Sequence, residues 1–178
     1  MTIQKNKYKF KKYSKNFPTL YKKEKAKLVK ILPKGIKIEH VGSTAVPGLG
    51  GKGIVDITIA VKKGKNKMKN ILLEKKYEIM PNASGDDRIS FKKIYKNKRK
   101  TRRVHVHLTA HGGKEWKGVI AFRNYLIKHS NIAKEYAKIK KEAVKIAKGK
   151  GKLYRKHKDA FIKRITKLAL KEQKHERA

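Results

Sequence analysis

Residues 39–61, which read EHVGSTAVPGLGGKGIVDITIAV, decide the fold of this chain. An apolar run at residues 36–41 ends at Gly42-Ser43, and a glycine-rich connection follows. Residues 54–61 then alternate β-branched side chains with others, which is typical of a buried or half-buried strand. The pattern predicts two strands joined by a loop with special backbone angles. Small residues with free backbone N–H groups, followed by a strand that carries a carboxylate, suit a phosphate or a metal-bound phosphate.

The rest of the chain predicts an α+β fold, in which a small sheet is followed by helices. Apolar periodicity predicts two helices in the N-terminal half of the chain, at residues 19–31 and 66–76. It places further strands at residues 77–80, 89–95 and 103–109, with a hairpin turn at residues 96–100. From residue 114 onward it predicts three helices, the second capped by Ser130 or Asn131 and the third starting near Leu153. The inward positions of that second helix are expected at Ile132, Tyr136, Ile139, Ala143 and Ile146.

The domain organisation follows from the same pattern. We expect a basic arm at residues 1–17 and a single domain at residues 18–178, with a sheet portion at about residues 36–109 and a helical portion at about residues 114–172. The arm interleaves lysines with four aromatic residues, Tyr8, Phe10, Tyr13 and Phe17. Such a mixture can bind single-stranded nucleic acid by stacking and charge, or it can dock its rings on the domain. We expect the second arrangement.

The composition indicates a folded chain with an extreme positive charge. Its 178 residues carry a formal net charge of +38, and apolar residues recur with a periodicity that argues against disorder. Basic surfaces attract nucleic acids, anionic lipids and phosphorylated ligands. Lysine supplies most of the charge and occurs on every expected element, whereas readers of base edges favour arginine. A lysine-rich proteome or a high-salt cytosol is therefore the first explanation, ahead of a nucleic-acid surface and then of a membrane surface.

The chain contains no cysteine, which excludes disulfides, thiolate zinc sites and cysteine nucleophiles. Its first 17 residues lack the apolar segment of a secretory signal. No window approaches the roughly 18 apolar residues that a membrane span needs. We therefore expect a cytoplasmic protein that does not enter a membrane.

Two of the expected strands carry polar side chains on one face, because side chains alternate across a strand. In the strand at residues 54–61 the odd positions are β-branched and form a core face. In the strand at residues 103–109 the even positions are valine and leucine, and Arg103 begins the opposite, polar face. If the two strands are neighbours with their core faces aligned, four side chains face one cleft: Asp56, Thr58, His105 and His107.

A carboxylate and two imidazoles on one wall can hold a divalent metal ion. The candidate metal ligands are Asp56, His105 and His107. In the alternative interpretation these residues are structural. The aspartate then receives N–H bonds from the glycine-rich loop, and the imidazoles bond to their neighbours. Both interpretations stay open.

The turn Gly42-Ser43-Thr44 is expected at the rim of this cleft. Its amides and hydroxyls can hold phosphate oxygens, and Lys52 and Arg123 are the candidate charge partners. The expected ligand is therefore a nucleotide or another phosphorylated small molecule.

Three segments of the chain resemble the GrpB family, a group of uncharacterised proteins placed in the nucleotidyltransferase superfamily. They are EHVGSTAVPGLGGKGIVDI, RVHVHL and FRNYLIKHSNIAKEYAKIKKE, in family order, and they cover about residues 36–142. The resemblance implies a nucleotidyltransferase-like fold: a small mixed β-sheet backed by helices, with a C-terminal helical portion. In polymerase-β-like members of the superfamily a Gly-Ser element precedes a strand with two acidic residues, and a later strand supplies a third. These carboxylates hold two Mg²⁺ ions.

Against that pattern Gly42-Ser43 match the Gly-Ser element and Asp56 matches the first acidic position. Thr58 stands in place of the second acid, and an imidazole, His105 or His107, stands near the third. One carboxylate with imidazoles suits Mn²⁺ or Zn²⁺ better than a pair of Mg²⁺ ions. The resemblance thus implies the fold more firmly than it implies nucleotidyl transfer.

Three functional hypotheses follow. In the first, the chain transfers a nucleotidyl group with a divalent metal (Mg, Mn or Zn) to an unknown acceptor, and Asp56 and His107 are the catalytic residues. In the second, the same cleft binds a nucleotide or another anionic ligand without turning it over. In the third, the lysine-rich surface associates with nucleic acid, and binding falls steeply with salt.

Overall fold

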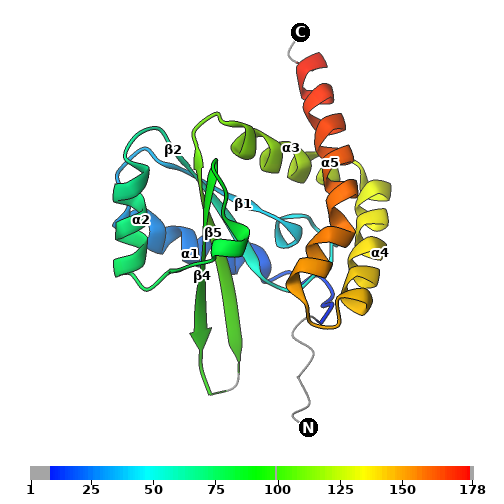
Figure 1. Ribbon diagram of the computed structural model, residues 1–178, viewed down its shortest axis with the longest axis horizontal. Helices are drawn as coiled ribbons and strands as arrows, with labels where there is room; N and C mark the ends of the chain where they lie inside the picture. Colours follow the sequence, from blue (N-terminus) through cyan, green and yellow to red (C-terminus); the bar gives the residue numbers. More distant parts are fainter. Residues whose placement is uncertain (1–8, 99, 177–178) are drawn as a thin grey trace.

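The computed structural model describes residues 9–98 and 100–176 and has a five-stranded sheet at its centre (Figure 1). In chain order the strands are β1 (Lys37–Val41), β2 (Val55–Val61), β3 (Glu78–Ile79), β4 (Arg88–Lys96) and β5 (Thr101–Ala110). Their order in the sheet is β1-β2-β5-β4-β3. The central pair, β2 and β5, is parallel, and every other pair is antiparallel. This mixed sheet, followed by helices, confirms the expected α+β class.

Helices lie on both faces of the sheet (Figure 1). They are α1 (Phe17–Ile31), α2 (Lys65–Glu74), α3 (Lys114–Lys128), α4 (Ser130–Ala147) and α5 (Gly151–His175), with short 3-10 turns η1 (Ser43–Ala45) and η2 (Pro81–Ala83). α1 and α2 lie on one side, and α3 leads to the pair α4 and α5 on the other. None of the helices in the described ranges combines the length and apolar character that a bilayer crossing requires.

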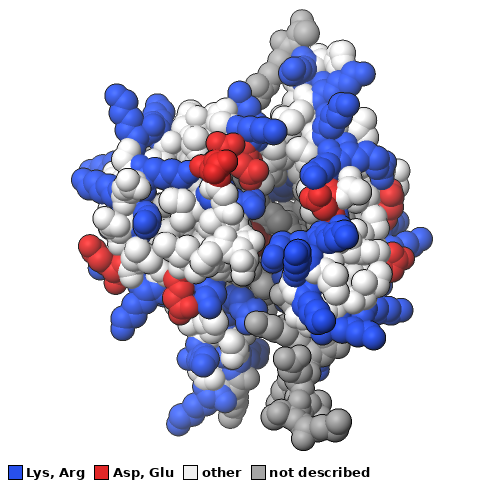
Figure 2. Space-filling view, viewed as in Figure 1, with Lys and Arg blue, Asp and Glu red and all other residues white. Residues whose placement is uncertain are grey.

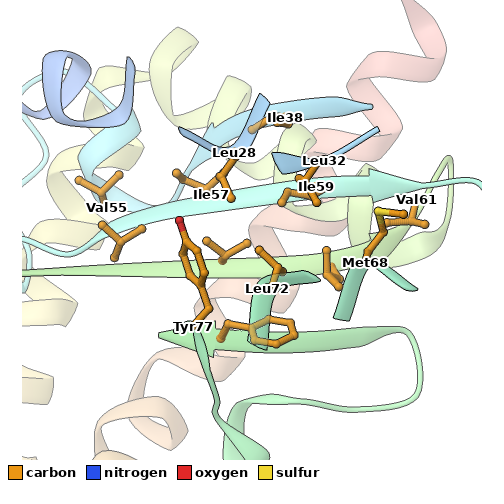
Figure 3. Close-up of a cluster of buried hydrophobic side chains, with 14 of the residues drawn as sticks. Leu28, Leu32, Ile38, Val55, Ile57, Ile59, Val61, Met68, Leu72 and Tyr77 are labelled. Atoms are coloured by element: carbon orange, nitrogen blue, oxygen red, sulfur yellow. The ribbon is translucent and has the colours of Figure 1, made fainter. Parts of the chain in front are cut away.

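The main core lies between the sheet and the first two helices (Figure 3). Ile57 and Ile59 of β2 are fully buried there, because the expected alternation puts them on one face. Leu28 of α1 and Leu72 of α2 cover them and are also fully buried. Each such side chain contributes about 1.5–3 kcal/mol to folding through the hydrophobic effect. Because the odd-numbered side chains of β2 are packed in this core, the even-numbered ones, such as Asp56, lie on the opposite face of the sheet.

A second, smaller core joins the glycine-rich loop between η1 and β2 to the C-terminal helices. Val46 and Leu49 of that loop are buried against Leu126, Tyr136 and other apolar side chains of α3, α4 and α5. The loop is therefore held between the sheet and the helical portion.

Several element boundaries differ from the sequence prediction. α1 begins at Phe17 because Pro18, whose φ is fixed near the helical value, is accepted in the first turn of a helix. The capping prediction for α4 is wrong, because α4 begins at Ser130 itself. His129 is the single residue between α3 and α4, so it occupies the N-cap position, and it makes no side-chain cap bond. The last helix begins at Gly151, two residues before the expected start.

The described part of the basic arm contacts the domain. Lys11 exchanges two backbone hydrogen bonds with Gly51, with N–O distances of 2.6 and 2.9 Å. The ring of Phe10 lies so close to Gly50 that an added Cβ there would be 2.5 Å from it. Residues 1–8, including Tyr8, lie outside the described residues. The arm thus closes over the glycine-rich loop at these positions.

The positive charge is spread over the visible face of the molecule (Figure 2). Lys and Arg side chains lie over both the sheet half and the helical half, and acidic side chains form a few small groups between them. This face shows no single patch that would mark a nucleic-acid surface, so that hypothesis stays a prediction.

Candidate functional site

Asp56 lies at the centre of the site, on the sheet face opposite the main core. The parallel register of β2 and β5 pairs Asp56 with His105 and Thr58 with His107. His105 Nδ1 lies 3.2 Å from Asp56 Oδ1, and His107 Nε2 lies 3.8 Å from the same oxygen. The expected convergence of the aspartate and the two imidazoles is therefore confirmed. Their metal-binding and catalytic roles stay predictions.

The two imidazoles are held differently. His105 directs Nδ1 to the Asp56 carboxylate, which leaves its Nε2 on the far side of the ring. His107 Nδ1 lies 2.9 Å from Ser90 Oγ. Ser90 gives its one hydroxyl hydrogen to the Ala83 carbonyl, so it accepts a hydrogen bond from Nδ1–H of His107. The Nε2 atom of His107 therefore faces Asp56.

The environment favours the charged form of Asp56. Burial alone raises the pKa of this carboxyl, but the close contact with His105 and the more distant one with His107 outweigh burial and hold the pKa well below its ordinary value. The side chain keeps 25% of its surface exposed. Asp56 is thus an ionised carboxylate that keeps part of its surface accessible.

Thr58, which stands in place of a second acid, is part of the sheet packing. It is 1% exposed, and its hydroxyl lies 3.4 Å from both the His107 carbonyl and the Thr109 hydroxyl. Thr109 donates in turn to the Ile59 carbonyl. The hydroxyl of Thr58 therefore serves as a hydrogen-bond partner for buried groups of β5, and it is not accessible to a ligand.

The residues present do not fit a two-metal centre. Within residues 9–98 and 100–176, no three acidic or imidazole side chains are arranged so that they could hold a metal ion. Hard cations such as Mg²⁺ prefer carboxylate oxygens, and Asp56 supplies the only carboxylate among the predicted ligands. Two further carboxylates, Asp86 and Asp87, are exposed in the turn before β4. The predicted ligands therefore lack the carboxylates that a two-metal mechanism requires.

The turn Gly42-Ser43-Thr44 lies against this site, as expected. Gly42 has φ +71°, and a Cβ added to it would lie 2.6 Å from Asp56 Oδ2. Ser43 Oγ lies 2.5 Å from the position of a Cβ on Gly51. Thr44 is buried and donates to the Ile54 carbonyl. The turn is therefore packed between the carboxylate and the glycine-rich loop, and its role in phosphate binding stays a prediction.

His40 fixes the turn from the side of β1. Its ring stacks on Tyr21 with a centroid distance of 4.6 Å, and its Nε2 lies 2.9 Å from Thr44 Oγ1. Burial lowers the pKa of His40 to about 4; the negative charge of Asp56 opposes this shift, and the positive charge of Arg123 adds to it.

This lowered pKa predicts a pH-dependent stability. Between pH 6.5 and about pH 4 the unfolded chain binds a proton at His40 that the folded chain does not, so the free energy of unfolding falls as the pH falls through this window. We expect a contribution of roughly 1–2 kcal/mol, after discounting for partial exposure. Urea unfolding of the wild type and of His40→Gln at pH 7, 5.5 and 4 measures it. Parallel pH profiles for the two proteins would contradict the assignment.

Arg123 is placed away from the predicted phosphate-binding role. Its NH1 donates to Glu39 Oε2 at 2.8 Å and to the His40 carbonyl at 2.7 Å, and its Nε donates to Asn124. The side chain is 16% exposed. The structure therefore shows Arg123 joining α3 to β1, and a contact with a ligand stays untested.

Lys52 borders a pocket of about 260 Å³, and Asp56, whose charge acts on Lys52, is not among the residues that line it. The lining residues come from the arm, the glycine-rich loop and the start of β5: Lys9, Lys11, Lys52, Gly53, Ile54, Thr101 and Arg103. The Nε atom of Arg103 is buried and has no hydrogen-bond partner among the described residues. Burial lowers the pKa of Lys52, while the charge of Asp56 opposes that shift. The pocket thus brings together four basic side chains.

Two further lysines lie near Asp56 that the sequence did not indicate. Lys140 of α4 is 2% exposed and donates to the Gly50 carbonyl. Burial, helped by the charge of Lys158, lowers the pKa of Lys140 to about 7. Burial and then the charge of Lys52 lower the pKa of Lys158 to about 8. In sequence these residues look like solvent-exposed lysines of an amphipathic helix, and only the fold shows otherwise.

Comparison with known proteins identifies relatives over most of the chain. A family model described as GrpB protein matches residues 7–168. The UPF0157 protein YqkA of Bacillus subtilis (strain 168) is 29% identical over 136 residues, which is 73% of this chain and only 38% of YqkA. The glutamate-rich protein GrpB of Alkalihalophilus pseudofirmus is 29% identical over 157 residues, which is 86% of this chain and 90% of that protein. The chain therefore spans less than half of one relative and most of another.

Solved structures support the same grouping. The crystal structure of conserved protein GrpB from Enterococcus faecalis matches with a TM-score of 0.79 and 31% identity, and the match covers 93% of this chain and 99% of that one. The Cid1 poly(U) polymerase matches with a TM-score of only 0.42 and 13% identity over 73% of this chain and 45% of that one. A likeness as slight as the second supports no statement about function.

Proposed function

This chain belongs to the GrpB protein family, and from the basic pocket that Lys52 borders we propose that it binds a phosphorylated small molecule, with a nucleotide as the first candidate. The observation that carries the proposal is the pocket where Lys9, Lys11, Lys52 and Arg103 converge. Ammonium and guanidinium groups bind phosphate oxygens by charge-assisted hydrogen bonds, which are about twice as strong as neutral ones. A volume of about 260 Å³ accommodates phosphoryl groups, with the rest of the ligand toward the open side.

Arg103 gives the pocket a specific need for an acceptor. Its Nε is buried and unpartnered among the described residues, and a buried donor without an acceptor costs about 1–3 kcal/mol. Because Nε has almost no accessible surface, it gains a phosphate oxygen as acceptor only if the Arg103 side chain shifts when the ligand enters the pocket. Such a shift would offset this cost in addition to the charge attraction.

The site favours binding over metal-dependent nucleotidyl transfer. Thr58 is buried where a second carboxylate would be needed, and the described residues form no cluster of three metal-ligating side chains. The Asp56 carboxylate with His105 and His107 could still move a proton, because an imidazole held by a carboxylate is a common general base. Nucleotidyl transfer remains the second candidate for this reason.

Binding is tested by melting and calorimetric titration with ATP, GTP, CTP, UTP and ribose 5-phosphate, with adenosine as the unphosphorylated control. A salt concentration of about 0.15 M limits the general attraction of a +38 chain for any anion. We expect the phosphorylated compounds to raise the melting temperature and adenosine to leave it unchanged. Arg103→Met should weaken binding about tenfold, because it removes a charge-assisted hydrogen bond.

The matched control is Lys67→Met, which removes one positive charge from the exposed side of α2. Equal losses in Lys67→Met and Arg103→Met would mean that only the overall charge binds the ligand, and the proposed site would be wrong. Pyrophosphate release from an NTP with Mg²⁺ or Mn²⁺, abolished in Asp56→Ala, would instead establish nucleotidyl transfer. Under the binding proposal Asp56→Ala keeps its affinity for the ligand.

A further inference from the structure

Lys158 of α5 lies at the centre of a second group of positive charges next to the pocket. Its Nζ lies 4.3 Å from the centroid of the Tyr154 ring, and Lys52 Nζ lies 4.6 Å from the same centroid. The two ammonium groups are therefore no farther apart than the sum of these distances. Arg155 adds a further positive charge that acts on both lysines.

Lys140 of α4 is the third lysine of this group of positive charges. Its ammonium group donates to the Gly50 carbonyl and lies 4.8 Å from the centroid of Tyr136. It is almost fully buried, whereas Lys158 is half-buried and can be reached from solvent. Of these two lysines, Lys158 is therefore the one that a ligand arriving from solvent can contact.

The described residues supply little negative charge to balance Lys140 and Lys158. No carboxylate in residues 9–98 and 100–176 forms an ion pair with Lys140 or Lys158, and Asp56 is the acidic side chain whose charge acts on both. The carboxylate of Asp56 is already bonded to His105 and contacts His107. Placing like charges together costs free energy, which a bound anion would offset.

We propose that Lys158, with Lys52 and Lys140, forms a second anion subsite that takes a second phosphoryl group of the ligand. This inference rests on the proposed function, because Lys52 belongs both to the first pocket and to this group. The ligand class is thereby narrowed to compounds that carry two or more linked phosphates, such as nucleoside di- and triphosphates or pyrophosphate. A compound with one phosphate fills the first pocket alone.

The experiment measures how affinity depends on the number of phosphates. Inorganic phosphate, pyrophosphate and tripolyphosphate are titrated into the full chain by calorimetry at one fixed ionic strength. We expect pyrophosphate to bind at least about tenfold more tightly than phosphate, because the second subsite adds a charge-assisted contact. Lys158→Met should remove most of this gain and leave the affinity for phosphate within about threefold of the wild type.

Lys156→Met is the matched control, because Lys156 is exposed on the same helix. It should keep the gain from phosphate to pyrophosphate. If phosphate and pyrophosphate bind but Lys158→Met keeps the full gain, the subsite is wrong while the proposed binding function stands. If none of the three anions binds the wild type, both proposals fail. Melting temperatures of the two variants within a few degrees of the wild type show that each is folded.

Discussion

Replacing Glu24 by alanine is expected to lower the free energy of unfolding by about 3–5 kcal/mol, the usual cost of removing one partner of a buried charged network. Glu24 of α1 is fully buried. Its Oε1 accepts hydrogen bonds from Tyr77 and Tyr95, both at 2.7 Å, and its Oε2 lies 3.4 Å from Arg102 NH2. Without the carboxylate, two hydroxyls and a guanidinium lose their acceptor, and Arg102 already has a buried NH1 without a partner among the described residues.

Urea unfolding of a graded set of variants separates the parts of this network. Tyr95→Phe removes one hydrogen bond and should cost about 1 kcal/mol. Glu24→Gln keeps an acceptor oxygen but loses the charge that faces Arg102, so its cost should lie between those of Tyr95→Phe and Glu24→Ala. Lys23→Ala, at an exposed position of the same helix, is the control and should change stability by less than about 0.5 kcal/mol. A loss below about 1 kcal/mol in Glu24→Ala would show that solvent reaches this cluster.

The strand portion of the site could be predicted because strand periodicity is strict. Side chains alternate with a period of two, so the apolar pattern around Ile57 predicted Asp56 on the opposite face without any knowledge of the tertiary fold. The observed burial of Ile57 agrees with that pattern. The same alternation placed His105 and His107 together on β5. The cluster also requires that β2 and β5 are neighbours in the sheet, as they are in the structure. The sequence alone did not establish that pairing, so it entered the prediction as an assumption.

The helical contributions could not be predicted, because helix periodicity leaves the buried stripe uncertain by one residue. In α4 the pattern favoured Ile139 and Ile146 as inward positions, but Ile146 is 50% exposed. Lys140 and Ala147 are buried in the neighbouring positions instead. Lys140 can be buried because the Gly50 carbonyl, distant in sequence, accepts its hydrogen bond.

Glu24 and Arg123 show the same limit for charged residues. A glutamate in a lysine-rich helix is typical of an exposed position, and the hydroxyls of Tyr77 and Tyr95 that bury Glu24 come from 53 and 71 residues away. Arg123, whose predicted phosphate contact stays a prediction, donates to Glu39 and to a backbone carbonyl of β1, which the sequence did not indicate. A charged side chain forms its hydrogen bonds and ion pairs with the partners that the fold brings close to it. Long-range packing decides which residues those partners are.

Replacing Gly42 by alanine is expected to damage both stability and the site, because two separate costs combine at this position. Gly42 has φ +71° and ψ −170°, a region that is essentially restricted to glycine and costs other residues about 1–3 kcal/mol. The added Cβ would also lie 2.6 Å from Asp56 Oδ2, which cannot retreat freely because His105 and His107 hold the carboxylate. Overpacking of this kind costs a further 1–3 kcal/mol, roughly. The total expected loss is about 2–6 kcal/mol.

Gly48→Ala separates the two costs. Gly48 also has a positive φ, +76°, but an added Cβ there meets nothing within 4 Å, so only backbone strain remains. Gly42→Ala should therefore lose roughly 1–3 kcal/mol more than Gly48→Ala in urea unfolding. In an Asp56→Ala background the contact with Oδ2 is gone and only the contact with Cβ, at 3.1 Å, remains, so the cost of Gly42→Ala should fall toward that of Gly48→Ala. A cost of Gly42→Ala that is the same with and without the carboxylate would mean that the turn does not press on Asp56, and that the turn and the carboxylate do not form one site.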